Sequence, residues 1–163
     1  MEGRRKGFLR NSIFGAEDSL VSTVGLLSGV SFAGLSSREI IVSGVILILV
    51  EALSMGAGTY IADDSTNQLE TVKSERENQL YNAVVMFFSY VLIGLIPLAP
   101  YLFSADTRTA FFYSLGATLF ALFCLGLFRG FYVGQSLWKS AVKITIIGSV
   151  TAGIGVMVGY LLR

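Results

Sequence analysis

Long runs of apolar residues, separated by short polar segments, dominate the chain. Five of these runs are close to the ~20 residues that a helix needs to cross ~30 Å of hydrocarbon. They cover residues 12–35, 40–61, 82–103, 109–128 and 141–162. The pattern predicts an all-α integral membrane protein, with one transmembrane domain of five helices over residues 1–163.

The composition agrees with a membrane protein and excludes several other classes. Hydrophobic residues make up 53% of the chain and charged residues 14%, with a mean hydropathy of +0.69, whereas a soluble domain carries roughly a quarter charged residues. The net charge of +1 gives no basic field for nucleic acid. The chain has no histidine and a single cysteine, Cys124, so imidazole metal sites and an intrachain disulfide are excluded. We expect no enzymatic activity, no bound cofactor and no nucleic-acid partner.

Lysine and arginine residues gather on one side of the predicted helices. Nine lie before the first run, between the second and third runs, and from the end of the fourth to the first residues of the fifth, whereas three lie at the opposite ends. Positive residues mark the cytoplasmic side of a membrane protein. We therefore expect a cytoplasmic N-terminus and a C-terminus outside or in a lumen, as an odd number of crossings requires.

The longest polar stretch is "DDSTNQLETVKSERENQ", within the short acidic connector predicted over residues 62–81. If the second helix continues into it, Asp63, Glu70 and Glu77 share one face at helical spacing. The stretch is either a solvated connector or a cytoplasmic platform that collects metal cations. Glu17, near the start of the first run, is expected to be an entrance residue of the same kind.

A stripe of small and polar residues follows one face of the first predicted helix. Asp18, Ser22, Gly25 and Gly29 are spaced by four, three and four residues. Such a stripe lets another helix approach closely. We expect it to face the first helix of a second copy of the chain.

The second predicted helix carries a carboxylate and a thioether on one face, at Glu51 and Met55. If the two helices run antiparallel, Asp18 and Met55 lie at one depth, and Glu51 lies about 6 Å deeper. An ionisable group at that depth is costly unless it is hydrated, paired or protonated, and neither run contains lysine or arginine. Glu51 is then either neutral and bonded to a neighbouring helix, or close to a bound cation. Met55 is either packing filler or a ligand.

Two segments carry a resemblance to a known family. "FGAEDSLVSTVGLLSGVS" and "EALSMGAGTYIADDS" resemble the vacuolar iron transporter family, whose first helix has an acid before a Gly/Ser-rich run, as in D-G-L-V-S-T. Its second helix carries S-M-x-x-G-x-Y, which stands here as Ser54, Met55, Gly58 and Tyr60. The third run, "FFSYVLIGLIPLAPYLF", is also similar to the family's third helix. The resemblance covers nearly the whole chain, and its two helix motifs are specific together but weak singly.

The resemblance implies a homodimer of five-helix protomers that exports Fe(II), and often Mn(II), from the cytoplasm in exchange for protons. The ion path would lie at the dimer interface, in a cell membrane of a prokaryote or a vacuole-like organelle of a eukaryote. Asp18 matches the family's essential first-helix aspartate, Met55 matches its metal-contacting methionine, and Asn11 falls where many members carry another acid. The implied partners are a second copy, the bilayer and the divalent metal as substrate.

The sequence departs from the family in two places. Some members have an acid eight residues before the methionine, where this chain has Leu47; its acid, Glu51, is four residues before. Many members also insert a long Glu-rich cytoplasmic domain between the second and third helices, where about twenty residues stand here. Glu70, Glu75 and Glu77 would be its remnant.

The combined prediction is a metal/proton antiporter in which each protomer supplies metal ligands and proton-coupling groups. The metal ligands are Asp18, Glu51 and Met55, and proton coupling falls to Glu51 and Asp18. The path is lined by Asn11, Ser22, Gly25, Gly29, Ser54 and Gly58. The alternatives are a non-transporting membrane subunit, whose polar residues only join helices, and a transporter of another solute.

Overall fold

The computed structural model describes residues 2–69, 76–104 and 106–163, and the backbone alone of residues 2–6, 66–69 and 76–78. It consists of five helices, each with a stretch long and apolar enough to cross a membrane. They are α1 (Glu2–Phe32), α2 (Ser37–Leu69), α3 (Arg76–Phe103), α4 (Thr107–Val133) and α5 (Leu137–Leu161). The prediction of five long apolar helices is confirmed, and the bounds at which they cross a membrane stay a prediction. The helices extend beyond the apolar runs, most clearly at the start of α1 and the end of α2, where polar residues continue the same helix.

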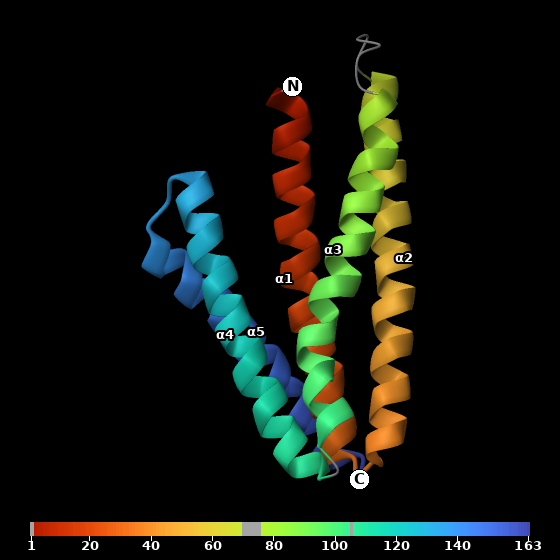
Figure 1. Cartoon of the computed structure of the whole chain (residues 1–163), viewed down its shortest axis with the longest axis vertical. Coiled ribbons are helices and arrows are strands. Elements are labelled where there is room, and N and C mark those ends of the chain that lie inside the picture. Colours follow the sequence, from red (N-terminus) through yellow and green to blue (C-terminus); the bar gives the residue numbers. More distant parts are fainter. Residues whose placement is uncertain (1, 70–75, 105) are drawn as a thin grey trace.

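Helix α1 is the centre of the bundle. It contacts each of the other four helices, and it lies between the pair α2 and α3 and the pair α4 and α5 (Figure 1). The two termini lie at opposite ends of the molecule (Figure 1). This arrangement agrees with an odd number of membrane crossings.

Polar residues at the helix ends define the connections. Before α2, the backbone N–H and hydroxyl of Ser36 donate to the Glu39 carboxylate at 2.8 and 2.7 Å, a reciprocal capping arrangement. Before α4, Asp106 accepts hydrogen bonds from the hydroxyl and the backbone N–H of Thr109, which hold the pKa of Asp106 below its ordinary value. Gly134 ends α4 in the left-handed region, at φ 68°.

Glycines bring α1 and α5 into direct backbone contact. A Cβ atom added at Gly155 would collide with the carbonyl oxygen of Gly25, and one at Gly159 with that of Gly29. The stripe on α1 therefore packs against α5 of the same chain. The prediction that it packs against the first helix of a second copy is wrong at Gly25 and Gly29, because α5 already occupies that face.

Hydroxyl groups join α1 to α3. Ser19 donates to the backbone carbonyl of Tyr90 at 2.7 Å, and the hydroxyls of Ser22 and Tyr90 are 2.6 Å apart. Further along, the hydroxyls of Ser31 and Tyr101 are 2.8 Å apart. Polar groups inside a bilayer need partners within the protein, and these pairs supply them. Ser22, the remaining small residue of the α1 stripe, therefore faces α3.

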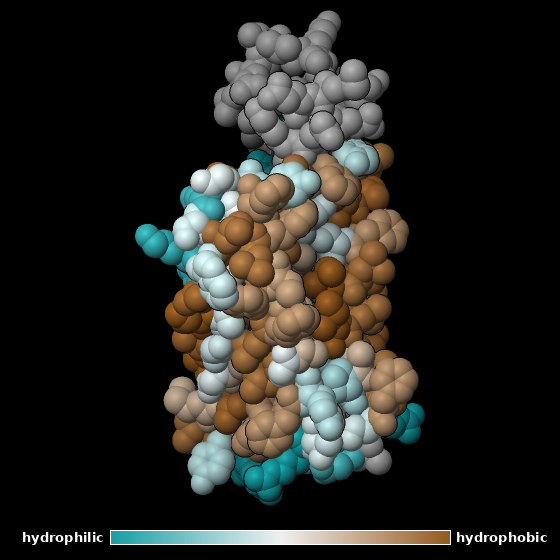
Figure 2. Space-filling model, turned by 60° about the vertical axis from the view of Figure 1, so that its left-hand side comes forward, coloured by the Kyte–Doolittle hydropathy of each residue, from teal (hydrophilic) through white to brown (hydrophobic). Residues whose placement is uncertain are grey.

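The outer surface is strongly apolar. Large side chains such as Phe103, Phe120 and Phe131 are 88%, 71% and 75% exposed. One face of the molecule shows a broad hydrophobic belt, with hydrophilic side chains gathered at its lower end (Figure 2). In water each such exposed side chain forgoes roughly 2 kcal/mol of burial, whereas in a bilayer the belt is the lipid-facing surface.

Candidate ion path

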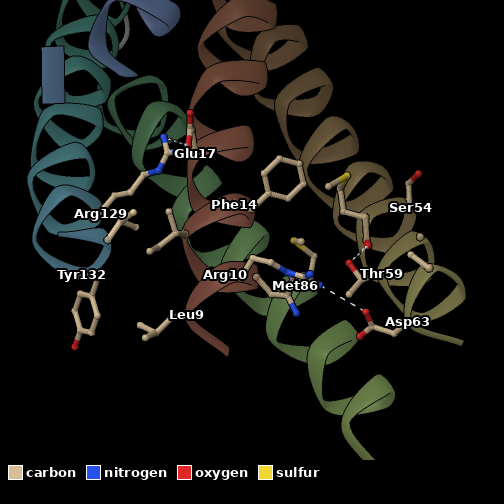
Figure 3. A pocket seen from close by; sticks show the side chains of 16 residues that line it. Leu9, Arg10, Phe14, Glu17, Ser54, Thr59, Asp63, Met86, Arg129 and Tyr132 are labelled. Atoms are coloured by element: carbon tan, nitrogen blue, oxygen red, sulfur yellow. Dashed lines mark hydrogen bonds and ion pairs between the residues drawn. The ribbon is translucent and has the colours of Figure 1, made fainter. Parts of the chain in front are cut away.

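A cavity of about 910 Å³ opens into the half of the bundle that contains the start of α1 (Figure 3). Its walls come from four helices: the first turns of α1, the last turns of α2, one residue of α3 and the end of α4. The α4 wall is contributed by Arg129, Tyr132 and Val133. The cavity therefore depends on how α4 approaches α1, which no single helix motif specifies.

Six of the residues singled out in the sequence line this cavity. They are Asn11, Glu17, Ser54, Met55, Gly58 and Asp63. The packing of α1 against α2 and α3 brings them together, although about 40 residues or more separate the two groups along the chain. Gly25 and Gly29 lie instead in the α1–α5 contact and do not line the cavity.

Two arginine–carboxylate ion pairs cross the cavity (Figure 3). Arg129 of α4 lies 3.8 Å from Glu17 of α1, and Arg10 of α1 lies 3.6 Å from Asp63 of α2. Asp63 also accepts a hydrogen bond of 2.7 Å from the amide of Asn82 on α3. Both acids are thus held by arginines, so a cation that arrives at either carboxylate must displace a guanidinium group.

The other two acids predicted at the metal entrance are not placed. Glu70 lies outside the described residues, and so does the side chain of Glu77, although its backbone belongs to α3. The described part of the connector confirms that α2 continues past the apolar run, to Leu69.

Next to the cavity-lining residues of α1 and α2, three polar side chains from three helices interact. Asp18 of α1 and Glu51 of α2 are close enough for their negative charges to repel each other. The hydroxyl of Tyr90 on α3, hydrogen-bonded to Ser22, interacts electrostatically with both carboxylates. Met55 is one turn from Glu51 on α2 and lines the cavity, so the cavity reaches the edge of this polar layer.

Neither carboxylate of this layer forms an ion pair with lysine or arginine among the residues that the structure describes. In the same part of the chain, no group of three or more Asp, Glu, Cys or His side chains is positioned to hold a metal ion. The predicted ligands Asp18, Glu51 and Met55 therefore include only two side chains of these four types.

Sequence reasoning missed Tyr90, Met86, Arg10 and Arg129 as residues of this region. Tyr90 and Met86 lie in an apolar run, where an aromatic or a methionine is normally core packing. Both are indeed buried, at 0% and 2% exposure. The arginines were counted only as markers of orientation. Their pairing with acids on other helices depends on tertiary structure.

Known proteins of similar sequence include several transporters. A vacuolar iron transporter of Centaurea cyanus is 26% identical over 204 aligned residues, which cover 88% of this chain and 83% of that protein. A vacuolar iron transporter of Plasmodium berghei is 22% identical over 229 residues, covering 97% and 83%. Vacuolar iron transporter homolog 1 of Arabidopsis thaliana is 26% identical over 172 residues, covering 96% and 86%.

The aligned lengths differ because of insertions. The alignment with the Centaurea cyanus protein has 204 positions but spans 88% of this 163-residue chain, so about 60 positions fall opposite gaps here. The alignment with the Arabidopsis thaliana homolog has 172 positions over 96% of the chain, which leaves about 16 such positions. This chain is thus a short form, closer in length to the homolog.

The sequence profile of the VIT family matches this chain in two segments, residues 9–82 and 70–160. The segments overlap at the connector between α2 and α3, and together they cover residues 9–160, which include most of each of the five helices. Because they cover most of its length, the chain belongs to the VIT family, that of the vacuolar iron transporters.

Proposed function

We propose that this protein exports Fe(II), and also Mn(II), from the cytoplasm in exchange for protons. The observation that carries the proposal is the interacting pair Asp18 and Glu51, which lies inside the membrane-spanning bundle without a cationic partner among the described residues. Asp18 and Glu51 do not line the cavity themselves, but it is lined by Glu17, which precedes Asp18, and by Met55, one turn from Glu51. The iron-transporting relatives support iron as the substrate, and VIT family transporters are not enzymes.

The chemistry of the pair links metal to protons. Two carboxylates close together in an apolar region cannot both stay charged unless a cation joins them. Without metal, the pair therefore holds a proton; when a divalent cation binds, the proton is released. Carboxylate oxygens with one thioether suit Fe(II) and Mn(II) better than Mg(II), which keeps its waters and prefers hard ligands.

The number of ligands argues for a homodimer. Asp18, Glu51 and Met55 of one copy leave a divalent metal with open positions, and a symmetry-related set would fill them. The glycine stripe of α1 is not free for this contact, because α5 covers it. The dimer contact would instead use the open side of the cavity, along α1 and α2.

The distribution of positive residues supports the direction of transport. The cavity opens in the half of the bundle that holds the start of α1, and the nine lysines and arginines on that side favour a cytoplasmic position. The cavity would then receive cytoplasmic metal. Arg10 and Arg129 would release Asp63 and Glu17 as a divalent cation approaches, which limits occupation by monovalent cations.

Glu51→Gln should separate metal movement from proton movement. Glutamine keeps the size and hydrogen bonds of a protonated glutamate but cannot release a proton. We expect the variant to pass Mn(II) while it moves far fewer protons per metal ion. The measurement is internal pH and internal metal in dye-loaded proteoliposomes after external Mn(II) is added.

The matched control is Glu39→Gln, which lies at the start of the same helix and keeps its capping hydrogen bonds. It should behave as the unsubstituted protein. An undiminished proton-to-metal ratio in Glu51→Gln would show that Glu51 is a helix contact and that Asp18 alone couples protons. If the unsubstituted protein moves neither Fe(II) nor Mn(II), the proposed function is wrong.

A further inference from the structure

A second methionine lies on the route from the cavity to the carboxylate pair. Met86 of α3 is 2% exposed, yet it lines the cavity (Figure 3), as do Met55 of α2 and Phe14 of α1. Neither its exposure nor its place in an apolar run distinguishes Met86 from an ordinary core residue. Its contact with α1 distinguishes it.

The sulfur of Met86 rests on a glycine of α1. A Cβ atom added at Gly15 would stand 2.9 Å from the Met86 sulfur and 3.2 Å from its carbonyl oxygen, so the missing side chain provides the space for the thioether. On α1, Gly15 follows Asn11 by four residues and precedes Asp18 by three, which places all three on one face. Gly15, which the sulfur contacts, is therefore about 4.5 Å along the helix axis from Asp18, toward the start of α1.

An unsatisfied polar group lies on the same face. Asn11 is 2% exposed and lines the cavity, and its amide nitrogen has no hydrogen-bond partner in the described part of the chain. A buried amide without a partner is costly. The amide oxygen, a ligand that divalent cations accept, receives a hydrogen bond of 3.4 Å from Nε of Arg10, which a bound cation would replace.

We propose that Met86 is a second thioether ligand on the ion path, which together with Met55 and the Asn11 amide forms a site at the neck of the cavity, above Asp18. The inference rests on the proposed function. Thioethers bind soft and borderline cations and interact weakly with hard ones. The site would therefore favour Fe(II) over Mn(II) before the metal reaches the carboxylates, where both are accepted.

Met86→Leu tests this selectivity, since leucine keeps the apolar volume and removes only the sulfur. In anaerobic proteoliposomes we expect the initial Fe(II) rate to fall about tenfold, and the Mn(II) rate to change less than about twofold, since a lost ligand contact costs on the order of tenfold in metal affinity. The matched control is Met157→Leu on α5, whose side chain is 56% exposed and outside the cavity. It should change neither rate. An unchanged ratio of Fe(II) to Mn(II) rates in Met86→Leu would overturn the inference.

A binding measurement keeps the inference independent of transport. The protein, labelled with ¹³C on the methionine methyl groups, is titrated with Cd(II), a soft diamagnetic probe, in detergent micelles. The methyl signals of Met55 and Met86 should shift together while that of Met157 stays in place. A Met86 signal that stays in place while the Met55 signal shifts would overturn the proposed site. Shifts of both signals in a protein that moves no metal would support the site and contradict the proposed function.

Discussion

Asp18→Asn should reduce Fe(II) transport in proteoliposomes by about 100-fold, the upper range for loss of a contact that tunes a metal site. Asparagine has nearly the size of aspartate, so the packing of α1 should persist. It removes one of the two charges that interact at the centre of the bundle, and with it the strongest metal ligand and an exchangeable proton. The measurement is the initial rate of metal uptake under anaerobic conditions.

Asp106→Asn is the matched control for this substitution. Asp106 caps α4 outside the spans, and asparagine caps a helix about as well as aspartate. The Fe(II) transport rate of Asp106→Asn should therefore be unchanged. Met55→Ala should reduce the Fe(II) transport rate about as much as Asp18→Asn. A wild-type rate in Asp18→Asn, with the control also active, would remove Asp18 from the ion path.

Helix geometry predicted that the two central acids lie near one another. Antiparallel spans and a rise of 1.5 Å per residue predicted that Asp18 and Glu51 would lie within about one turn in depth, and the structure brings their charges into interaction. Depth is readable from sequence because the bilayer fixes where a span begins and ends. The role of these acids as metal ligands stays a prediction.

Contacts between helices could not be predicted in the same way. The stripe of Gly25 and Gly29 on α1 correctly indicated a close helix contact, but a small-residue stripe does not specify its partner. A second stripe, with Gly155 and Gly159, was also visible on α5. The structure packs these two stripes against each other, whereas the first stripe was expected to pack against the same stripe of a second copy.

The residues that surround the cavity could not be predicted from the sequence either. Arg129 reaches Glu17 because the end of α4 lies beside the start of α1, and this depends on the crossing of helices that are more than a hundred residues apart. Sequence periodicity locates a residue on a face of its own helix. It does not determine which other face lies opposite, so the ion pairs and the position of Met86 required the folded structure.

Two glycines of α5 should respond very differently to the same substitution. A Cβ atom at Gly155 would collide with the carbonyl oxygen of Gly25, whereas one at Gly153, two residues earlier, would meet nothing within 4 Å. Gly155→Ala forces two backbones apart, and overpacking of this kind costs about 1–3 kcal/mol. We expect its unfolding temperature in detergent to fall by roughly 2–12 °C.

Gly153→Ala is the internal control, because it adds the same methyl group to the same helix but leaves the α1–α5 contact intact. It should unfold at the wild-type temperature or slightly above, since alanine favours a helix by up to about 1 kcal/mol over glycine. Unfolding is followed by size-exclusion chromatography of samples heated in detergent. Equal temperatures for the two variants would contradict the backbone contact between α1 and α5. Since α1 carries Asp18, a loosened contact in Gly155→Ala should also lower metal transport, whereas Gly153→Ala should transport normally.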